Sequence, residues 1–221
     1  MLRGLIFDLD GTLVDTNDAH IESWVRAFKQ NGFTVRREQI VPLVGMGSDK
    51  LAPAILGDVD KLTLDALRQC VTEAYIQIAR RRRFRVMPGA VELLVELRRQ
   101  VIRTALATSG TDDQVNATMD SAGIDFRDCV EVTVTGSDAK STKPDPDVVL
   151  ASVQRLRVSA DECAMIGDTR HDGEACRRAG VRFLALTCGG YGEDELRAAG
   201  AIDVWTDPAA LLLDLPRLLE R

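Results

Sequence analysis

The sequence predicts an α/β fold in which a doubly wound parallel sheet forms the core and an all-helical block is inserted close to its start. Two observations predict this fold. Short apolar runs without alternation, which are typical of strands buried on both faces, recur along the chain and are separated by amphipathic stretches. One long region, from about Asp15 to Phe84, breaks this order, because it carries helical periodicity and no convincing strand.

The core elements follow from the positions of these runs. Strands are expected at residues 2–9, 102–108, 130–135, 163–166, 182–187 and 203–205. Helices are expected at residues 89–99, 112–122, 145–155, 172–179 and 208–219. Gly123 and Gly180 directly follow two of these helices, where a helix C-terminus favours glycine. Asp145 and Asp147 are expected to be acids that mark the start of a helix.

The inserted helical block is expected at residues 15–85, between core segments 1–14 and 86–221. Apolar side chains at helical spacing indicate its first helix: Ile21, Trp24, Val25 and Phe28. A second helical stretch covers residues 64–79. The two connections between the block and the core would then act together as a hinge.

Composition excludes several classes of partner. The net charge of −6 argues against nucleic acid as the main partner. The five cysteines are scattered without a Cys-x-x-Cys pair, which suggests free thiols in a reducing cytoplasm. With two histidines, a zinc site is not expected. A metal would be hard and oxygen-bound, and we expect Mg²⁺. No signal peptide or bilayer-length apolar run is evident, so we expect a cytoplasmic protein without a membrane partner. We also expect a monomer or a homodimer.

Two carboxylates stand at the end of the first strand. Asp8 and Asp10 follow an apolar run, and Gly11 then ends the strand with a turn. Side chains at i and i+2 of a strand point the same way, so the two carboxylates should converge. A surface Asp-Gly turn is the simpler interpretation. However, an apolar strand that ends in paired acids at the edge of an α/β sheet favours a site for a cation or a phosphoryl group.

Three further groups of polar residues follow predicted strands, where open α/β sheets bind ligands. Residues 108–110 (Thr-Ser-Gly) offer hydroxyls and free N–H groups just before a helix, which is a plausible anion site. Lys143 stands before a proline-marked helix start, and Asp168 and Asp172 follow the fourth strand. Each has a simpler alternative, such as a solvated lysine or acids that favour a helix N-terminus.

Taken in order, these motifs resemble those of the haloacid dehalogenase-like phosphohydrolase superfamily. Its pattern is Asp-x-Asp-Gly-Thr, then Thr or Ser, then Lys, then Gly-Asp-x-x-x-Asp. This chain carries the pattern at Asp8, Asp10, Gly11 and Thr12, then Thr108, Lys143, Gly167, Asp168 and Asp172. The helical block looks like the small helical cap of the phosphoglycolate phosphatase and β-phosphoglucomutase subgroup. The resemblance covers essentially the whole chain and implies a Rossmann-like core with an inserted cap domain.

The resemblance implies separate tasks for the paired acids. Asp8 would attack phosphorus and form an aspartyl-phosphate. Asp10 would protonate the leaving oxygen and later deprotonate the attacking water. Asp8 is therefore expected to stay ionised on the metal, while Asp10 holds a proton part of the time. Mg²⁺ would be bound by Asp8, by the backbone carbonyl of Asp10 and by Asp168, with Asp172 binding directly or through water.

Other matched positions are implied in binding the phosphoryl group. Lys143 would place a positive charge between nucleophile and phosphate. The hydroxyl of Thr108 and the N–H groups near Ser109 and Gly110 would donate to the phosphoryl oxygens. Thr12 is expected to contribute to the same site.

Residues of the inserted block are expected to contact the leaving group. His20 lies close to the hinge and is a candidate for facing the cleft. Residues 45–48 (Gly-Met-Gly-Ser) either approach the substrate or form a plain turn between helices. Trp24 is expected in the core of the block, and the arginines at 80–83 on a solvated face rather than at a second anion site. His171 is expected to be exposed.

These expectations predict a Mg²⁺-dependent phosphatase that hydrolyses a small-molecule phosphomonoester. Phosphoglycolate, a sugar phosphate and a nucleotide monophosphate are the open alternatives for its substrate. A sugar-phosphate mutase of the β-phosphoglucomutase type is the alternative function, and Thr12 and the 45–48 loop favour a phosphatase over it. A non-enzymatic, receiver-like phospho-acceptor domain is the third alternative, but such domains carry no helical insertion.

Overall fold

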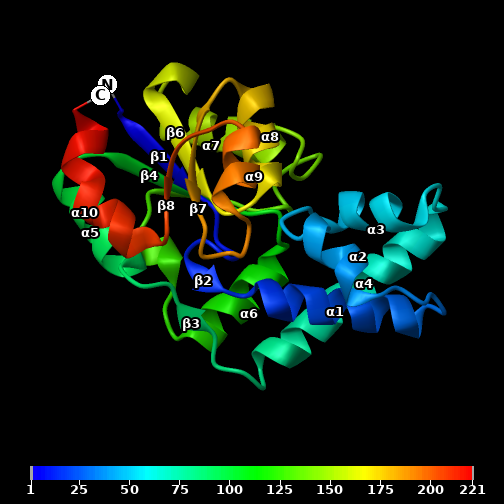
Figure 1. Cartoon of the computed structure of the whole chain (residues 1–221). Helices are drawn as coiled ribbons and strands as arrows, with labels where there is room; N and C mark the ends of the chain where they lie inside the picture. Colours follow the sequence, from blue (N-terminus) through cyan, green and yellow to red (C-terminus); the bar gives the residue numbers. More distant parts are fainter. Residues whose placement is uncertain (1, 221) are drawn as a thin grey trace.

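The computed structural model describes residues 2–220 of the chain (Figure 1). Within these residues, the core is a six-stranded parallel sheet in the order β5-β4-β1-β6-β7-β8. Its strands are β1 (Gly4–Phe7), β4 (Arg103–Ala107), β5 (Val132–Val134), β6 (Cys163–Gly167), β7 (Arg182–Leu186) and β8 (Ala201–Trp205). Each overlaps a predicted strand, so the predicted parallel α/β sheet is confirmed.

Helices cover both faces of this sheet (Figure 1). One face packs on α5 (Ala90–Arg99), α6 (Asp112–Ala122) and α10 (Pro208–Leu219), and the other on α7 (Asp147–Leu156), α8 (Arg170–Ala179) and α9 (Glu193–Ala198). Two short 3₁₀ helices, η2 (Phe126–Asp128) and η3 (Ala160–Glu162), precede β5 and β6. The central strand β1 packs on both faces of the sheet, because Leu5 and Phe7 belong to one hydrophobic cluster and Ile6 belongs to the other.

The sheet order brings three loops to one edge. β1 lies between β4 and β6, so the chain runs to one side of β1 in its first half and to the other side in its second. In open α/β sheets, ligands bind outside the carboxyl ends of the strands where the strand order reverses in this way. The polar segments that follow β1, β4 and β6 therefore meet at this edge.

Residues 15–85, which we call the helical insertion, form mostly helices: α1 (Asn17–Gln30), α2 (Arg37–Ile40), η1 (Val41–Leu43), α3 (Ser48–Leu56) and α4 (Lys61–Ala79). They have a hydrophobic cluster of their own, which contains Trp24 and Phe28, two of the residues that the periodicity predicted on the apolar face, together with Leu51 and Leu67. In Figure 1 this insertion projects from the carboxyl edge of the sheet. That it forms a separate domain stays a prediction.

The connections of the insertion contain a strand pair that the sequence pattern did not predict. β2 (Val14–Asp15) and β3 (Arg85–Val86) run antiparallel, and Asp15 pairs with Arg85 at 3.0 Å. Strands of two residues are too short for their periodicity to be recognised. The pair fastens the two connections side by side.

Two helix starts differ from the predictions. α7 begins at Asp147, and Asp145 lies before it, where its carboxylate pairs with Lys50 and Arg178, each at 2.6 Å. Asp145 therefore lies outside the helix and forms ion pairs with the helical insertion and with α8. α8 begins at Arg170, because the Thr169 side chain accepts the first-turn N–H of Asp172.

None of the helices within residues 2–220 combines the length and apolar character that a membrane crossing requires.

Candidate active site

Lys143 bridges two buried carboxylates at the centre of the carboxyl edge. Asp8 follows β1 directly, and Lys143 lies in the loop before α7. The lysine donates from Nζ to Oδ1 of Asp8 at 2.6 Å and to Oδ1 of Asp172 at 2.8 Å. All three side chains are at most 3% exposed. Buried charges of this kind persist only when they are paired, so each member depends on the others.

Asp168, directly after β6, completes the acidic group. Its two oxygens accept hydrogen bonds from Thr12 Oγ1 at 2.9 Å and from Asn17 Nδ2 at 3.0 Å. Gly11 makes this approach sterically feasible: its φ is +81°, and a Cβ there would lie 2.3 Å from Asp168 Oδ2. The loop after β1 is therefore packed against the loop after β6.

The three buried acids form a candidate metal site. Asp8, Asp168 and Asp172 each offer a carboxylate oxygen, and these oxygens lie within 4.8 Å of one another. Lys143 supplies one positive charge to three carboxylates, so a cation would offset the remaining negative charge. The donors are all oxygen atoms, which is the set that Mg²⁺ prefers. The Asp10 carboxylate is not part of this group.

The electrostatics of the group follow from burial and from mutual repulsion. Burial raises the pKa of Asp8 well above its usual value; the charge of Lys143 opposes this shift, and those of Asp172 and Asp168 add to it. Burial, followed by the charge of Asp172, raises the pKa of Asp168 to about 7. Burial alone would lower the pKa of Lys143, but the charges of Asp172 and Asp8 outweigh it and raise that pKa.

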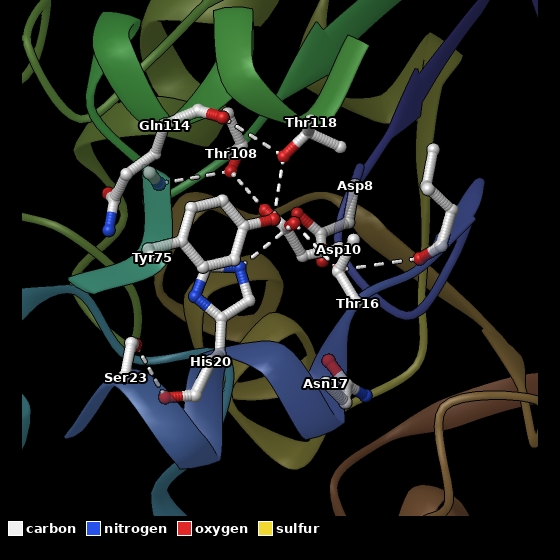
Figure 2. A network of polar contacts seen from close by, with 12 residues as sticks. Asp8, Asp10, Thr16, Asn17, His20, Ser23, Tyr75, Thr108, Gln114 and Thr118 are labelled. Carbon is white, nitrogen blue, oxygen red and sulfur yellow. Dashed lines mark hydrogen bonds and ion pairs between the residues drawn. The ribbon is translucent and has the colours of Figure 1, made fainter. Parts of the chain in front are cut away.

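Asp10 has surroundings that differ from those of Asp8. Its carboxylate accepts from Thr16 Oγ1 at 2.7 Å and from Thr108 Oγ1 at 3.2 Å. His20 Nε2 lies 3.0 Å from its Oδ1 (Figure 2). Burial alone would raise the pKa of Asp10, but the contacts with His20 and Thr16 outweigh burial and lower it. The protein groups alone thus raise the pKa of Asp8 and lower that of Asp10; the expected order, in which Asp8 is ionised on a bound metal, stays a prediction.

The segment after β4 offers one buried hydroxyl without a partner. The Gly110 N–H donates to Thr108 Oγ1 at 3.0 Å, which fixes the turn. The Ser109 hydroxyl oxygen is buried, and within residues 2–220 it has no hydrogen-bond partner. Buried hydroxyls are nearly always satisfied, so an unpartnered one beside a cavity indicates a ligand position.

A cavity joins these groups to the helical insertion. From the core it is lined by Asp8, Asp10, Thr108, Ser109, Gly110, Gln114 and Lys143, and from the insertion by His20, Trp24, Val44, Gly45, Met46, Gly47, Ser48, Leu51 and Val71. His20 therefore faces the cleft. Of the two interpretations of residues 45–48, the structure favours the loop that approaches the site.

This loop also contacts the core closely. A Cβ at Gly47 would lie 2.1 Å from Thr142 Oγ1, so only glycine permits this approach. Next to it, Asp49 accepts a hydrogen bond from the Thr142 hydroxyl. Lys50 pairs with Asp145 at 2.6 Å. These contacts hold the insertion over the cavity.

A second set of closing contacts converges on one carbonyl of the insertion. The Pro42 oxygen is 3.0 Å from Arg170 Nη2, 3.1 Å from His171 Nε2 and 2.9 Å from Tyr191 Oη. The expectation that His171 is exposed is wrong, because this contact buries its ring to 4% exposure. Burial lowers the pKa of His171, so the neutral ring is favoured.

Sequence reasoning missed three residues that support the site. Thr16 and Asn17 contact Asp10 and Asp168, although their positions indicated only a helix start. Tyr75 of α4 stacks on His20 at 4.2 Å between ring centroids and hydrogen-bonds Thr118 of α6 at 2.7 Å (Figure 2). Nothing in the local sequence distinguishes Tyr75 from an ordinary core residue, since its role depends on how α4 packs against α6.

Comparison with known proteins identifies similar chains. Residues 5–186 match the family model described as haloacid dehalogenase-like hydrolase. A probable phosphatase, IndB of Dickeya dadantii, is 32% identical over 200 residues, which span 88% of this chain and 85% of that protein. The chloroplastic protein SUPPRESSOR OF QUENCHING 1 of Arabidopsis thaliana is 28% identical over 84% of this chain, but the match spans 18% of that longer protein.

Solved structures share the whole fold. A hydrolase from Pseudomonas syringae superposes with a TM-score of 0.91 at 30% identity, over 99% of both chains. A β-phosphoglucomutase from Clostridium difficile superposes with a TM-score of 0.81 at 19% identity over the full length of both chains, which shows the fold alone. The family model and these likenesses agree with the order of motifs along the chain, so the chain belongs to the haloacid dehalogenase-like hydrolases.

Proposed function

We propose that the protein is a Mg²⁺-dependent phosphatase that hydrolyses a small-molecule phosphomonoester through an aspartyl-phosphate on Asp8. The observation that carries this proposal is the position of Asp8. Its carboxylate is paired with Lys143 and lines the same cavity as the unpartnered Ser109 hydroxyl. A phosphoryl group in that cavity would meet a nucleophile, a positive charge and hydrogen-bond donors together.

Asp8, Asp168 and Asp172 would hold Mg²⁺, with the backbone carbonyl of Asp10 as the further ligand that the family resemblance implies. When bound, the ion would offset the clustered carboxylates and polarise the phosphoryl group. It would also favour the ionised form of Asp8, against the effect of burial on that pKa.

The residues would act in two steps. In the first, an oxygen of Asp8 attacks phosphorus, the bond from phosphorus to the substrate oxygen breaks, and Asp10 gives its proton to the leaving alcohol. In the second, water attacks the aspartyl-phosphate, Asp10 takes the proton of the water, and phosphate leaves. Lys143 and Ser109 would hold the phosphoryl oxygens throughout. The Thr108 hydroxyl and the Gly110 N–H would join them by giving up their present contacts with Asp10 and Thr108. Thr12 would act indirectly, since its hydroxyl is bonded to Asp168.

Asp10 must carry a proton for the first step, and its neighbours oppose this. His20 lies within hydrogen-bond distance of Asp10, since its Nε2 is 3.0 Å from the carboxylate. We therefore propose that His20 acts through Asp10 and lines the leaving-group side of the cavity. Membership of a hydrolase family leaves no support for the receiver-like alternative. A cytoplasmic location and a monomeric or homodimeric state stay predictions.

Phosphate release from a panel of phosphomonoesters tests the proposal. Wild-type protein should release phosphate from at least one member with Mg²⁺ and should stop when EDTA removes the metal. Asp8→Asn should lower kcat by at least about 1,000-fold, because the nucleophile is lost while shape and burial are kept. The control Asp125→Asn alters an acid that pairs with Arg127 outside the cavity and should retain turnover. Full activity in Asp8→Asn would sink the proposal.

A further inference from the structure

The wall that the helical insertion gives to the cavity is almost entirely apolar. Its side chains are mainly Trp24, Val44, Met46, Leu51 and Val71, from α1, the loop before α3, α3 and α4. Trp24 and Leu51 also belong to the hydrophobic cluster of the insertion, so these walls are fixed by packing. Gly45 and Gly47 add backbone without side chains.

This wall has no cationic side chain fit to bind a second anion. Within residues 2–220, Lys143 is the one lysine or arginine that lines the cavity, and it is held by Asp8 and Asp172. Lys50, the nearest candidate in the sequence, is turned to Asp145 at 2.6 Å and does not line the cavity. His20 is the one ionisable side chain that the insertion contributes to the lining, and it faces Asp10.

From this lining we infer that the substrate is the phosphate ester of a small, uncharged and largely apolar alcohol. The inference rests on the proposed function and narrows it to one class of leaving group. A carboxylate or second phosphate on the leaving group would lose its hydration against Trp24, Met46 and Leu51 without gaining a counter-charge. An apolar group of the same size would instead gain from leaving water.

Two neutral polar side chains limit how many polar groups the alcohol can carry. Ser48 of the insertion and Gln114 of α6 both line the cavity. They could bind one hydroxyl or carbonyl of the leaving group. The lining therefore disfavours phosphoglycolate, nucleotide monophosphates and the bisphosphate that a sugar-phosphate mutase needs.

A matched pair of substrates tests the inference. Isobutyl phosphate and phosphoglycolate have leaving groups of the same shape, and they differ in whether the branch is apolar or a carboxylate. The wild-type protein with Mg²⁺ should show a kcat/KM at least about 100-fold higher for isobutyl phosphate, the cost of an unpaired buried charge. Equal values, or a preference for phosphoglycolate, would overturn the inference.

A charge placed in the wall provides a second test. Met46→Lys should shift the kcat/KM ratio toward phosphoglycolate by at least about tenfold, because the carboxylate then gains a partner. Leu62→Lys is the matched control, since Leu62 is 83% exposed on α4 and does not line the cavity. It should leave the ratio unchanged. An equal shift in both variants, or no shift in Met46→Lys, would contradict the role assigned to the wall.

Acetyl phosphate, a small and reactive acyl phosphate, separates failure of the inference from failure of the proposed function. If the wild type hydrolyses acetyl phosphate and Asp8→Asn does not, the proposed function stands. The kcat/KM values for isobutyl phosphate and phosphoglycolate then test the inferred leaving group. If no phosphate is released from acetyl phosphate or from either ester, the proposed function fails and the inference fails with it.

Discussion

Ser109 shows how a single side chain can be held for a ligand rather than for the stability of the fold. Its hydroxyl is buried beside Thr108 and Gly110 and has no partner within residues 2–220. An unsatisfied buried hydroxyl costs about 1–3 kcal/mol of folding free energy. A phosphoryl oxygen would satisfy it.

Replacing this hydroxyl should separate stability from activity. In Ser109→Ala the free energy of unfolding should stay the same or rise by about 1 kcal/mol, while kcat/KM falls about 10- to 100-fold. Urea unfolding and phosphate release measure the two. Ser152→Ala is the control, since the Ser152 hydroxyl is buried and donates to the Val148 carbonyl at 2.8 Å. It should lose about 1 kcal/mol of stability and keep its activity. The same pattern in both variants would contradict a ligand role for Ser109.

The raised pKa of Asp168 predicts a pH dependence of stability in metal-free protein. Its folded pKa of about 7 lies above the unfolded value, so the native state binds more protons between these two values. The free energy of unfolding should therefore fall as pH rises from about 4 to about 7 in EDTA. Asp168→Asn should flatten this decline, and saturating Mg²⁺ should oppose it by favouring the carboxylate. Identical pH profiles for wild type and Asp168→Asn in EDTA would refute this assignment.

At the scale of elements, the helical insertion joins the core through an apolar contact and through short polar contacts over the site. In the apolar contact, Tyr75, Ile78 and Ala79 of α4 belong to the hydrophobic cluster of the core sheet. The Pro42 carbonyl meets three core side chains, and the 45–48 loop packs on Thr142. The insertion keeps its own hydrophobic cluster, so closing and opening need not disturb its core. The polar contacts over the site are individually weak, which suits an element that must release product.

Breaking one closing ion pair should therefore affect substrate capture modestly. The Lys50–Asp145 pair is partly exposed, so Lys50→Met should shift the closed state by less than about 1 kcal/mol and raise KM about two- to fivefold. Steady-state kinetics with isobutyl phosphate measure this effect. The control Arg99→Met breaks the exposed Arg99–Glu96 pair within α5 and should leave KM unchanged. An unchanged KM in Lys50→Met would show that this pair does not contribute to closure.

At the scale of the whole molecule, most of the site residues that the sequence predicts lie at the carboxyl ends of the strands. Asp8, Lys143 and Asp168 follow three different strands, and Asp172 lies in the first turn of α8. The order of a parallel α/β sheet was enough to expect them at one edge. Periodicity placed the strands to within about two residues, because buried parallel strands are distinctly apolar.

The remaining features depend on contacts between distant elements. Tyr75 joins His20 to Thr118 only because α4 packs against α6, and His171 is buried only because Pro42 of the insertion reaches it. The pKa order of Asp8 and Asp10 likewise depends on burial and on which hydroxyls and rings surround each carboxylate. Local sequence patterns carry no information on such pairings.

Trapping the phosphorylated protein tests the central claim most directly. Wild-type protein with Mg²⁺ is mixed with acetyl phosphate, quenched within milliseconds, reduced with borohydride and digested for mass spectrometry. An aspartyl-phosphate would be reduced to homoserine, so the account predicts homoserine at position 8 and at no other aspartate. Phosphate release without this modification at Asp8, or modification of a different aspartate, would contradict the account.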